Sequence, residues 1–278
     1  MVTLNIVKFS FDNASGIGGN YFVNFADSAP KVSPSPGILY RYGELTGDPA
    51  MMKFASFMAQ QNQSFKDGVN GYFASALDEL FMYKDIVDHP QGEPLTGTYW
   101  FKDTQICVAR DTEGKSDGFF FAAKGGNNQE SHNHNDVGSC ILYYNALPVL
   151  IDAGVGTYTR QTFGPERYTI WTMQSDYHNL PLINGTPQKN GRELAAHNQQ
   201  YKATAKTVSY QVDIARAYPQ EANVKSWIRN YTLYRKKDFT ITDKWKLSAC
   251  NEPSVLNLMT CCEVEIDRNK NIILTGEA

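Results

Sequence analysis

The sequence predicts an α+β protein in which a helical part, residues 1–93, is followed by an antiparallel β part, residues 94–278. Two observations lead to this fold class. Apolar residues recur at helical spacing from residue 34 to 88, and short runs rich in Tyr, Phe, Val and Thr follow from residue 94. Because the helices precede the strands instead of alternating with them, a parallel βαβ sheet is not expected.

Three helices are expected in the first part. The segment 35–47 has apolar residues at helical spacing and closes on Gly47. In 48–61, Asp48 is the expected N-cap and Pro49 the first helical residue. A third helix is expected over 72–87, ahead of a linker that contains Pro and Gly.

The second part contains runs of strand-forming residues separated by turn signals such as DTEGKSDG at 111–118. Strands at this spacing indicate a β-sandwich or a barrel. The runs cover 96–103, 104–111, 118–125, 138–146, 147–154, 201–210, 212–219, 224–235 and 238–247.

Composition excludes several classes of protein. The chain has 42% hydrophobic and 20% charged residues, as folded globular proteins do. A formal net charge of −3 provides no overall positive field for nucleic acid, so no nucleic-acid partner is expected. No apolar stretch is long enough to span a bilayer, and no signal peptide is visible. The sequence stops just after a strand-like segment, which predicts a fragment.

The stretch SHNHNDVGSC, residues 131–140, places two of the five histidines two positions apart. If it enters a strand, His132, His134 and Asp136 lie on one face, because side chains alternate along a strand. Two imidazoles so close together could have different roles, one binding a metal and the other facing a substrate. Spacing alone does not assign these roles, and a polar turn is the other interpretation.

Two later residues extend the set. Asp152 ends the apolar run LPVLIDAG, where an unpaired carboxylate would be costly to bury, and His178 follows near a polar turn. His134, Asp152 and His178 therefore form a plausible N/O ligand set for zinc. The alternative is that the histidines lie in solvated loops and that Asp152 is paired or caps a turn.

These segments carry a family resemblance. The run from KGGNNQESHNHNDVG through LIDAGVGTYT to SDYHNLPLINGTPQ resembles the C-terminal β-sandwich of the heparinase II/III family of polysaccharide lyases. The upstream NYFVNFADSAP and the helices after it look like the end of that family's (α/α) toroid. The resemblance covers nearly the whole chain, and the order of its three motifs is more specific than any one of them.

The resemblance implies roles for individual residues. His134, Asp152 and His178 match the family's zinc ligands, and the metal there is mainly structural. His132 matches the histidine that faces the substrate cleft and is the expected catalytic residue. The implied reaction is β-elimination in a uronic-acid polysaccharide: a base removes the C5 proton and an acid protonates the leaving C4 oxygen. His132 could be the base or could neutralise the carboxylate.

The resemblance also implies a gap. The family's catalytic tyrosine, and an Asn or His that pairs with the uronate carboxylate, match nothing in residues 1–20. The chain is thus expected to be a lyase fragment without its full acid/base set. Further substrate contacts are expected from a Gly/Thr-rich loop and from the amides ahead of the histidine motif. These candidates are Tyr158, Arg160, Arg167, Asn127, Asn128 and Gln129.

Three functions stay open beside a heparan sulfate or other glycosaminoglycan lyase. One is an alginate oligosaccharide lyase of the same architecture, and another is a non-catalytic, zinc-containing carbohydrate-binding sandwich. The third is a cupin-type metal oxygenase, which the helical first part and the missing carboxylate spacing disfavour. The expected partner is an anionic polysaccharide. A further expected partner is a second copy of the chain, in a homodimer. By resemblance, a periplasmic location in bacteria is also expected.

Overall fold

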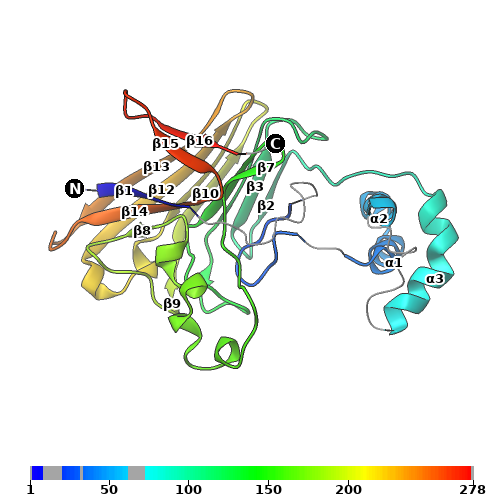
Figure 1. The fold of residues 1–278 in the computed structure, drawn as a ribbon, viewed down its shortest axis with the longest axis horizontal. Coiled ribbons are helices and arrows are strands. Elements are labelled where there is room, and N and C mark those ends of the chain that lie inside the picture. Colours follow the sequence, from blue (N-terminus) through cyan, green and yellow to red (C-terminus); the bar gives the residue numbers. More distant parts are fainter. Residues whose placement is uncertain (1, 9–20, 32–33, 62–72, 277–278) are drawn as a thin grey trace. The chain divides into compact units, whose positions relative to one another are not determined.

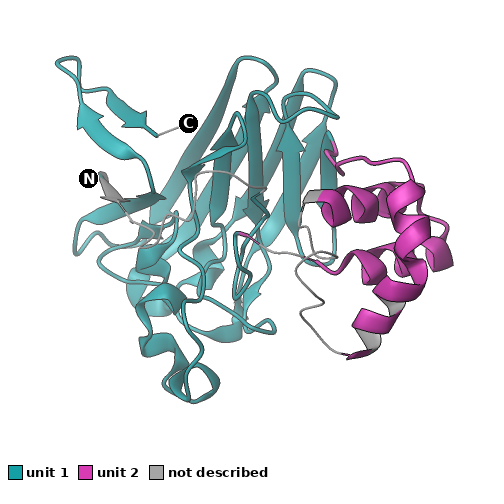
Figure 2. Ribbon diagram, turned by 45° about the vertical axis from the view of Figure 1, so that its right-hand side comes forward, with its two compact units in different colours: residues 1–30, 97–278 teal, residues 31–96 magenta. Residues whose placement is uncertain are grey.

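The computed structural model describes residues 2–8, 21–31, 34–61 and 73–276. The chain forms two compact units, one of residues 31–96 and one of residues 1–30 together with 97–278 (Figure 2). The second unit combines the N-terminal segment with all the strands that follow residue 97. No helix in the described ranges is long and apolar enough to cross a membrane.

The smaller unit consists of the three expected helices: α1 (Pro36–Thr46), α2 (Pro49–Gln61) and α3 (Phe73–Asp88). The hydroxyl of Ser35 accepts a hydrogen bond from the backbone of Ile38, and Gly47 ends α1 with φ 67°. The Asp48 carboxylate accepts from the N–H groups of residues 50 and 51, so the predicted N-cap is confirmed. The apolar faces form a small core of Tyr40, Ala55, Ala59, Met82 and Ile86.

A five-stranded antiparallel sheet in the larger unit is built from the runs that the sequence marked between residues 96 and 150. Its strand order is β2, β3, β4, β6, β7. The strands are β2 (Thr98–Phe101), β3 (Ile106–Arg110), β4 (Phe119–Lys124), β6 (Cys140–Tyr144) and β7 (Leu147–Leu150).

A four-stranded antiparallel sheet follows later in the chain, in the order β10, β11, β12, β13 (Figure 1). Alternate residues point to opposite faces, and one face of each sheet contributes to a shared apolar core that includes Phe121, Tyr210 and Trp227. The expected strand over 212–219 instead contains the end of β11 and a short 3-10 helix, η5 (Ala215–Ala217). The strands are β10 (His197–Ala203), β11 (Thr207–Asp213), β12 (Val224–Tyr234) and β13 (Asp238–Leu247).

A third sheet joins distant parts of the chain. β1 (Val2–Lys8) pairs in parallel with β14 (Ser254–Thr260), and β14 pairs on its other side with the two residues of β8 (Pro181–Leu182). Two small sheets complete the unit. They are β5 (Asn127–Asn128) with β9 (Gly191–Ala195), and the hairpin of β15 (Glu263–Ile266) and β16 (Ile272–Thr275).

The boundary between the parts differs from the expected division at residue 93. Residues 21–30 belong with the strands: Phe25 is buried in a cluster with Ala122, Ile141 and Tyr143 of the five-stranded sheet. The segment therefore reaches the face of the sheet that lies away from the shared core.

The chain between β7 and β8 contains no strand. Four short 3-10 helices occupy it: η1 (Gln161–Phe163), η2 (Arg167–Thr169), η3 (Trp171–Met173) and η4 (Ser175–Tyr177). Another, η6 (Gln220–Ala222), precedes β12. The long loop after β7 and the segment 21–30 supply the side chains described next.

Candidate functional site

The histidine motif does not enter a strand. Residues 129–139 are turns and irregular backbone between β5 and β6, and His132 has φ 56°, a left-handed conformation. The alternation expected of a strand is therefore absent. His132 is 58% exposed, whereas the side chain of His134 is fully buried. The two imidazoles thus lie on different sides of the surface, one facing solvent and one facing the interior.

His134, Asp152 and His178 come together in the interior. Each offers one ligand atom, and these atoms lie within 4.8 Å of one another. Asp152 follows the end of β7, and its Oδ2 lies 3.0 Å from Nδ1 of His178, just after η4. The second carboxylate oxygen accepts the backbone N–H of Gly154 at 2.9 Å. Nδ1 of His134 and Nε2 of His178 are buried without a hydrogen-bond partner.

The pKa values of His134, Asp152 and His178 are shifted by burial and by the charges of one another. Burial lowers the pKa of His134, and the neighbouring His178 lowers it further. For His178 burial also acts to lower the pKa, but the Asp152 carboxylate outweighs it and the net pKa is raised. Burial acts to raise the pKa of Asp152, and the charge and hydrogen bond of His178 reverse the direction. The pair of Asp152 and His178 therefore favours its charged form.

Neighbouring polar side chains hold this group in place without joining it. Asp136 is buried, and its Oδ1 accepts a hydrogen bond of 2.7 Å from the buried Lys124. The Asn179 amide donates to the carbonyls of Cys140 and Ile151, which lie on neighbouring strand ends. Asp136 is thus the partner of a buried lysine, although the expected strand would have placed it beside both histidines.

Asp27 joins the exposed and the buried histidine. Its side chain is only 4% exposed. Oδ2 lies 2.9 Å from Nδ1 of His132 and accepts a hydrogen bond of 3.0 Å from the Tyr158 hydroxyl. Oδ1 lies 3.0 Å from Nε2 of His134 and accepts one of 2.6 Å from Arg167. Burial acts to raise the pKa of Asp27, but the hydrogen bonds from Arg167, His132 and Tyr158 lower it.

Two of the predicted substrate contacts reach this cluster. The hydroxyl of Tyr158, whose side chain is exposed, also lies 3.4 Å from Nδ1 of His132. Arg167 is largely buried, and besides Asp27 it donates to the carbonyls of Asn133 and Thr162. Its guanidinium therefore anchors the loop to the motif segment, and little of it faces solvent.

The other predicted contacts lie elsewhere. Arg160 is exposed beside Glu166 in a shallow, open hollow of the long loop. Asn127 and Gln129 form a turn, in which the Asn127 side chain accepts the Gln129 N–H. Gln129 in turn accepts the N–H of Arg192 in β9. Asn128 is buried and donates to Gln188. These amides act within the turn and the β5–β9 pair.

Asp27 is the functional residue that sequence reasoning missed. It stands 105 positions before His132, and no spacing rule connects residues so far apart. The only available signal is the segment NFADSAP, in which the polar pair Asp27 and Ser28 follows apolar residues. The resemblance assigns that segment to the helical part, where its carboxylate would not meet the histidines.

Comparison with known proteins finds one matching family profile and several similar solved structures. The sequence profile described as "Heparinase II/III-like, C-terminal" matches residues 97–275. A search of curated proteins found no match. Among solved structures, a heparinase III matches with a TM-score of 0.57 at 20% identity, over 84% of this chain and 31% of that one. A heparan sulfate lyase, HepC from Pedobacter heparinus, matches with a TM-score of 0.55 at 15% identity, over 82% and 30%.

These structural matches concern the fold, and this chain spans less than a third of the length of either solved relative. The matched profile covers well over half of the sequence and contains His132, His134, Asp152 and His178. The chain therefore belongs to the heparinase II/III-like family.

Proposed function

We propose that this chain is the C-terminal part of a polysaccharide lyase that cleaves uronic-acid-containing polysaccharide by β-elimination. The observation that carries the proposal is the pair of His132 and Tyr158, both exposed, above the buried Asp27. Family membership supports a lyase of polysaccharides. In the same proposal, helices α1 to α3 are the end of an (α/α) toroid and the strands form the family's β-sandwich.

His134, Asp152 and His178 are the proposed ligands of a structural zinc ion. They fit the metal because the two imidazoles present buried nitrogens without partners and because Asp152 supplies an oxygen. Two histidines and a carboxylate suit zinc, with a fourth position for water or another group. Bound zinc would supply a crosslink between β7, the motif segment and the end of the long loop. In the described residues this group has no third histidine, which disfavours the cupin alternative.

The reaction needs a base for the C5 proton, neutralisation of the uronate carboxylate and an acid for the C4 oxygen. In the proposed mechanism, His132 provides the first or the second of these through its solvent-facing nitrogen. The hydroxyl of Tyr158 lies next to the same imidazole and can hydrogen-bond a sugar there. Arg167 contributes by holding Asp27 and the loop. Among Tyr158, Arg160, Asn127 and Gln129, only Tyr158 is placed to meet a substrate at His132.

The proposed substrate is heparan sulfate or another glycosaminoglycan, with alginate oligosaccharides as the second choice. The two solved relatives named above are a heparinase III and a heparan sulfate lyase, and this supports the first choice. The family's catalytic tyrosine and its carboxylate-pairing Asn or His match nothing in residues 1–20. The proposed contribution of this chain is consequently the His132 side of the cleft and the metal site. Its periplasmic location and homodimer formation stay predictions.

Replacing His132 with Ala tests this assignment. We expect uronate oligosaccharides to shift the NMR signals of the wild-type His132 ring, while neutral glucose oligosaccharides leave them unchanged. The His132→Ala variant keeps its zinc and melting temperature, because its side chain is exposed. Wherever ultraviolet absorbance shows that unsaturated uronate forms, the variant should be slower by about 10²–10⁴-fold. If heparan sulfate, chondroitin and alginate fragments all left the NMR signals of the wild-type His132 ring unchanged, His132 would not be a substrate-binding residue.

A further inference from the structure

Asp27 contacts both histidines of the motif through different oxygens. Oδ2 lies 2.9 Å from Nδ1 of His132, and Oδ1 lies 3.0 Å from Nε2 of His134. An ionised carboxylate only accepts hydrogen bonds, so each facing nitrogen must carry a proton. In the neutral imidazoles the remaining nitrogens then hold lone pairs: Nε2 of His132, on an exposed side chain, and Nδ1 of His134, in the interior.

We propose that Asp27 is a positioning residue that fixes the tautomers of both histidines, thereby aiming one imidazole at the substrate and the other at the metal. The proposal rests on the proposed function and adds the residue that couples its two halves. His134 offers a ligand atom within 4.8 Å of those of Asp152 and His178, and because its Nε2 contacts Asp27, the buried and unpartnered Nδ1 is the nitrogen left for a metal. A ligating histidine commonly donates its other ring N–H to a carboxylate, and this contact orients the ring.

Asp27 is itself held from two sides. Arg167 donates to Oδ1 at 2.6 Å and also to the Asn133 carbonyl, which lies between the two histidines. The residue before Asp27, Ala26, has φ 58°, and the turn that it forms brings the carboxylate inward. Because Arg167 requires an acceptor at the Oδ1 position, an amide replacing the carboxylate must place its NH2 group at the Oδ2 position. Substitution by Asn therefore separates the two functions of Asp27.

The test uses histidine-labelled, metal-free protein and long-range ¹H–¹⁵N correlation, which reports the protonated nitrogen of each ring. Wild type should show Nδ1–H for His132 and Nε2–H for His134; the opposite pair would overturn the proposal without any variant. In Asp27→Asn we expect His132 to change to Nε2–H while His134 keeps its tautomer. In Asp27→Ala both preferences disappear and zinc affinity, measured by chelator competition, falls about 10–100-fold.

Asp103→Asn is the matched control, since Asp103 is exposed in the same unit. It should leave tautomers and zinc affinity unchanged. Unaltered tautomers in both Asp27 variants would show that the carboxylate does not set them. This outcome is separate from that of the proposed function. The expected tautomers and tight zinc binding, together with no response to uronates, would contradict the lyase assignment. They would still support the positioning of both rings by Asp27.

A second, independent observation concerns the outer face of the four-stranded sheet. The residues that alternate with its core side chains are mostly hydroxyls, amides and lysines, and Ile228 and Asp238 are the exceptions on β12 and β13. In register across the strands, Lys202 lies beside Ser209, then Thr232 and Thr240. The next row begins with Gln200 and continues through Gln211, Asn230 and Thr242. Lys244 and Lys246 continue along β13 on the same face.

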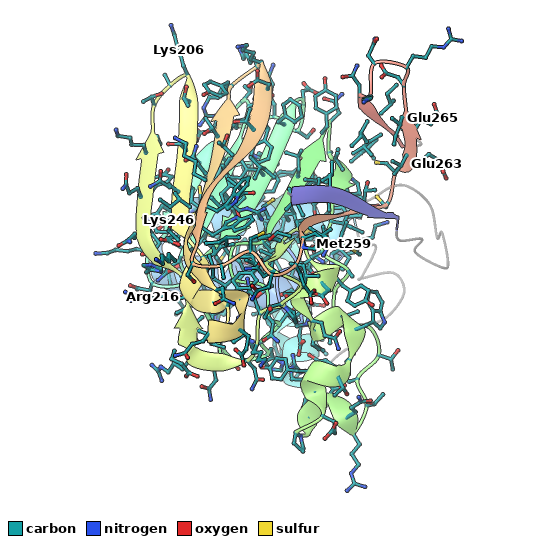
Figure 3. The ribbon with its side chains drawn as sticks, turned by 90° about the vertical axis from the view of Figure 1, so that its left-hand side faces the viewer. Lys206, Arg216, Lys246, Met259, Glu263 and Glu265 are labelled. Atoms are coloured by element: carbon teal, nitrogen blue, oxygen red, sulfur yellow. The ribbon has the colours of Figure 1, made fainter. Side chains whose placement is uncertain are left out.

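The segment that forms this sheet carries an excess of positive charge, although the whole chain does not. Residues 197–248 contain ten Lys and Arg against four Asp and Glu, while the formal net charge of the chain is −3. Lys202, Lys244 and Lys246 are exposed, and among the described residues none has an ion-pair partner. Figure 3 shows Lys206 at one end of the strands, and Lys246 and Arg216 toward the other. The positive charge thus extends along the sheet.

From this surface we propose a second binding site, distinct from the His132 cleft, for a polysaccharide chain that carries carboxylate or sulfate groups. The lysines neutralise its anionic groups, and the neutral amides and hydroxyls between them hydrogen-bond its hydroxyls. The polymer class rests on the proposed function. The one half-exposed carboxylate among the strand residues of this face, Asp238, lies at one end of β13 and pairs with Lys237 at 3.7 Å. A flat polar sheet of this kind suits an extended chain better than a compact protein partner.

The experiment compares two triple variants with the same change of charge. Lys202→Gln, Lys244→Gln and Lys246→Gln remove the charge of the face. Three exposed lysines elsewhere in the unit, Lys102, Lys115 and Lys270, become Gln in the control. We expect the first triple to weaken binding to heparan sulfate fragments at least tenfold and to elute from immobilised heparin at lower salt. The affinity of the control triple should stay within about twofold of wild type. Each contacting lysine that is removed should also reduce the dependence of the affinity on salt concentration.

Equal weakening by both triples would show a general effect of net charge and overturn the site. Equal binding of DNA through the same three lysines would make the partner any polyanion and overturn the polysaccharide assignment. Binding is measured with His132→Ala as the background. Failure of the lyase proposal therefore leaves this result unchanged.

Discussion

We expect the Asp152→Asn variant to lose its zinc and to unfold at a markedly lower temperature. Asp152 is buried at the centre of the proposed ligand set, and an amide is a much weaker zinc ligand than a carboxylate. A metal that binds only the folded state stabilises it by about 4 kcal/mol when free zinc is about a thousandfold above its Kd. For a unit of this size the loss corresponds to roughly 8–16 °C in Tm. Elemental analysis and calorimetry measure the two effects.

Asp136→Asn is the matched control for this variant. Asp136 is as buried as Asp152 and lies in the histidine motif, but it pairs with Lys124. We expect it to be destabilising, because a buried ammonium loses its partner, yet to retain one zinc ion per chain. If Asp152→Asn kept its zinc, or if both variants lost it alike, the ligand assignment would be wrong.

Arg229→Met should be the most destabilising change away from the metal site. The guanidinium is fully buried and donates to both oxygens of Asp243 at 2.8 Å. It also donates to the carbonyls of Gly138 and Asn179, so it ties the four-stranded sheet to the segments around the histidines. Its loss leaves a carboxylate and two carbonyls unpaired, at a cost of about 3–5 kcal/mol. Denaturant unfolding followed by fluorescence measures this.

Two further variants complete the test of Arg229. Arg192→Met, at an exposed position, should change the free energy of unfolding by at most about 0.5 kcal/mol. Removing Asp243 together with Arg229, as Arg229→Met with Asp243→Leu, should recover part of the loss because no unpaired carboxylate remains. A single Arg229→Met variant as stable as Arg192→Met would show that the buried pair contributes nothing to the fold.

The sequence predicts the helices and strands better than it predicts which strands pair with one another. The three helices and most of the strands follow from periodicity and turn residues, and the Asp48 cap is confirmed. The parallel pairing of β1 with β14 joins residues about 250 positions apart and leaves no periodic signal. The position of residues 21–30 is likewise not predicted, because a short apolar run does not reveal which sheet it covers.

For the site, residue types and order identified His134, Asp152 and His178 as a group, and the structure brings them together. Spacing alone left two interpretations open, and it suggested a strand where the chain makes a turn at His132. That turn is what separates the exposed imidazole from the buried one. Asp27 could not be found, because its contacts to both histidines exist only after the N-terminal segment has packed on the sheet.

The most direct test of the central claim is X-ray diffraction from crystals of the purified chain, recorded on both sides of the zinc absorption edge. The zinc assignment predicts an anomalous peak that appears only above the edge and lies among the side chains of His134, Asp152 and His178. A peak elsewhere, or no peak from crystals grown with zinc present, would contradict it.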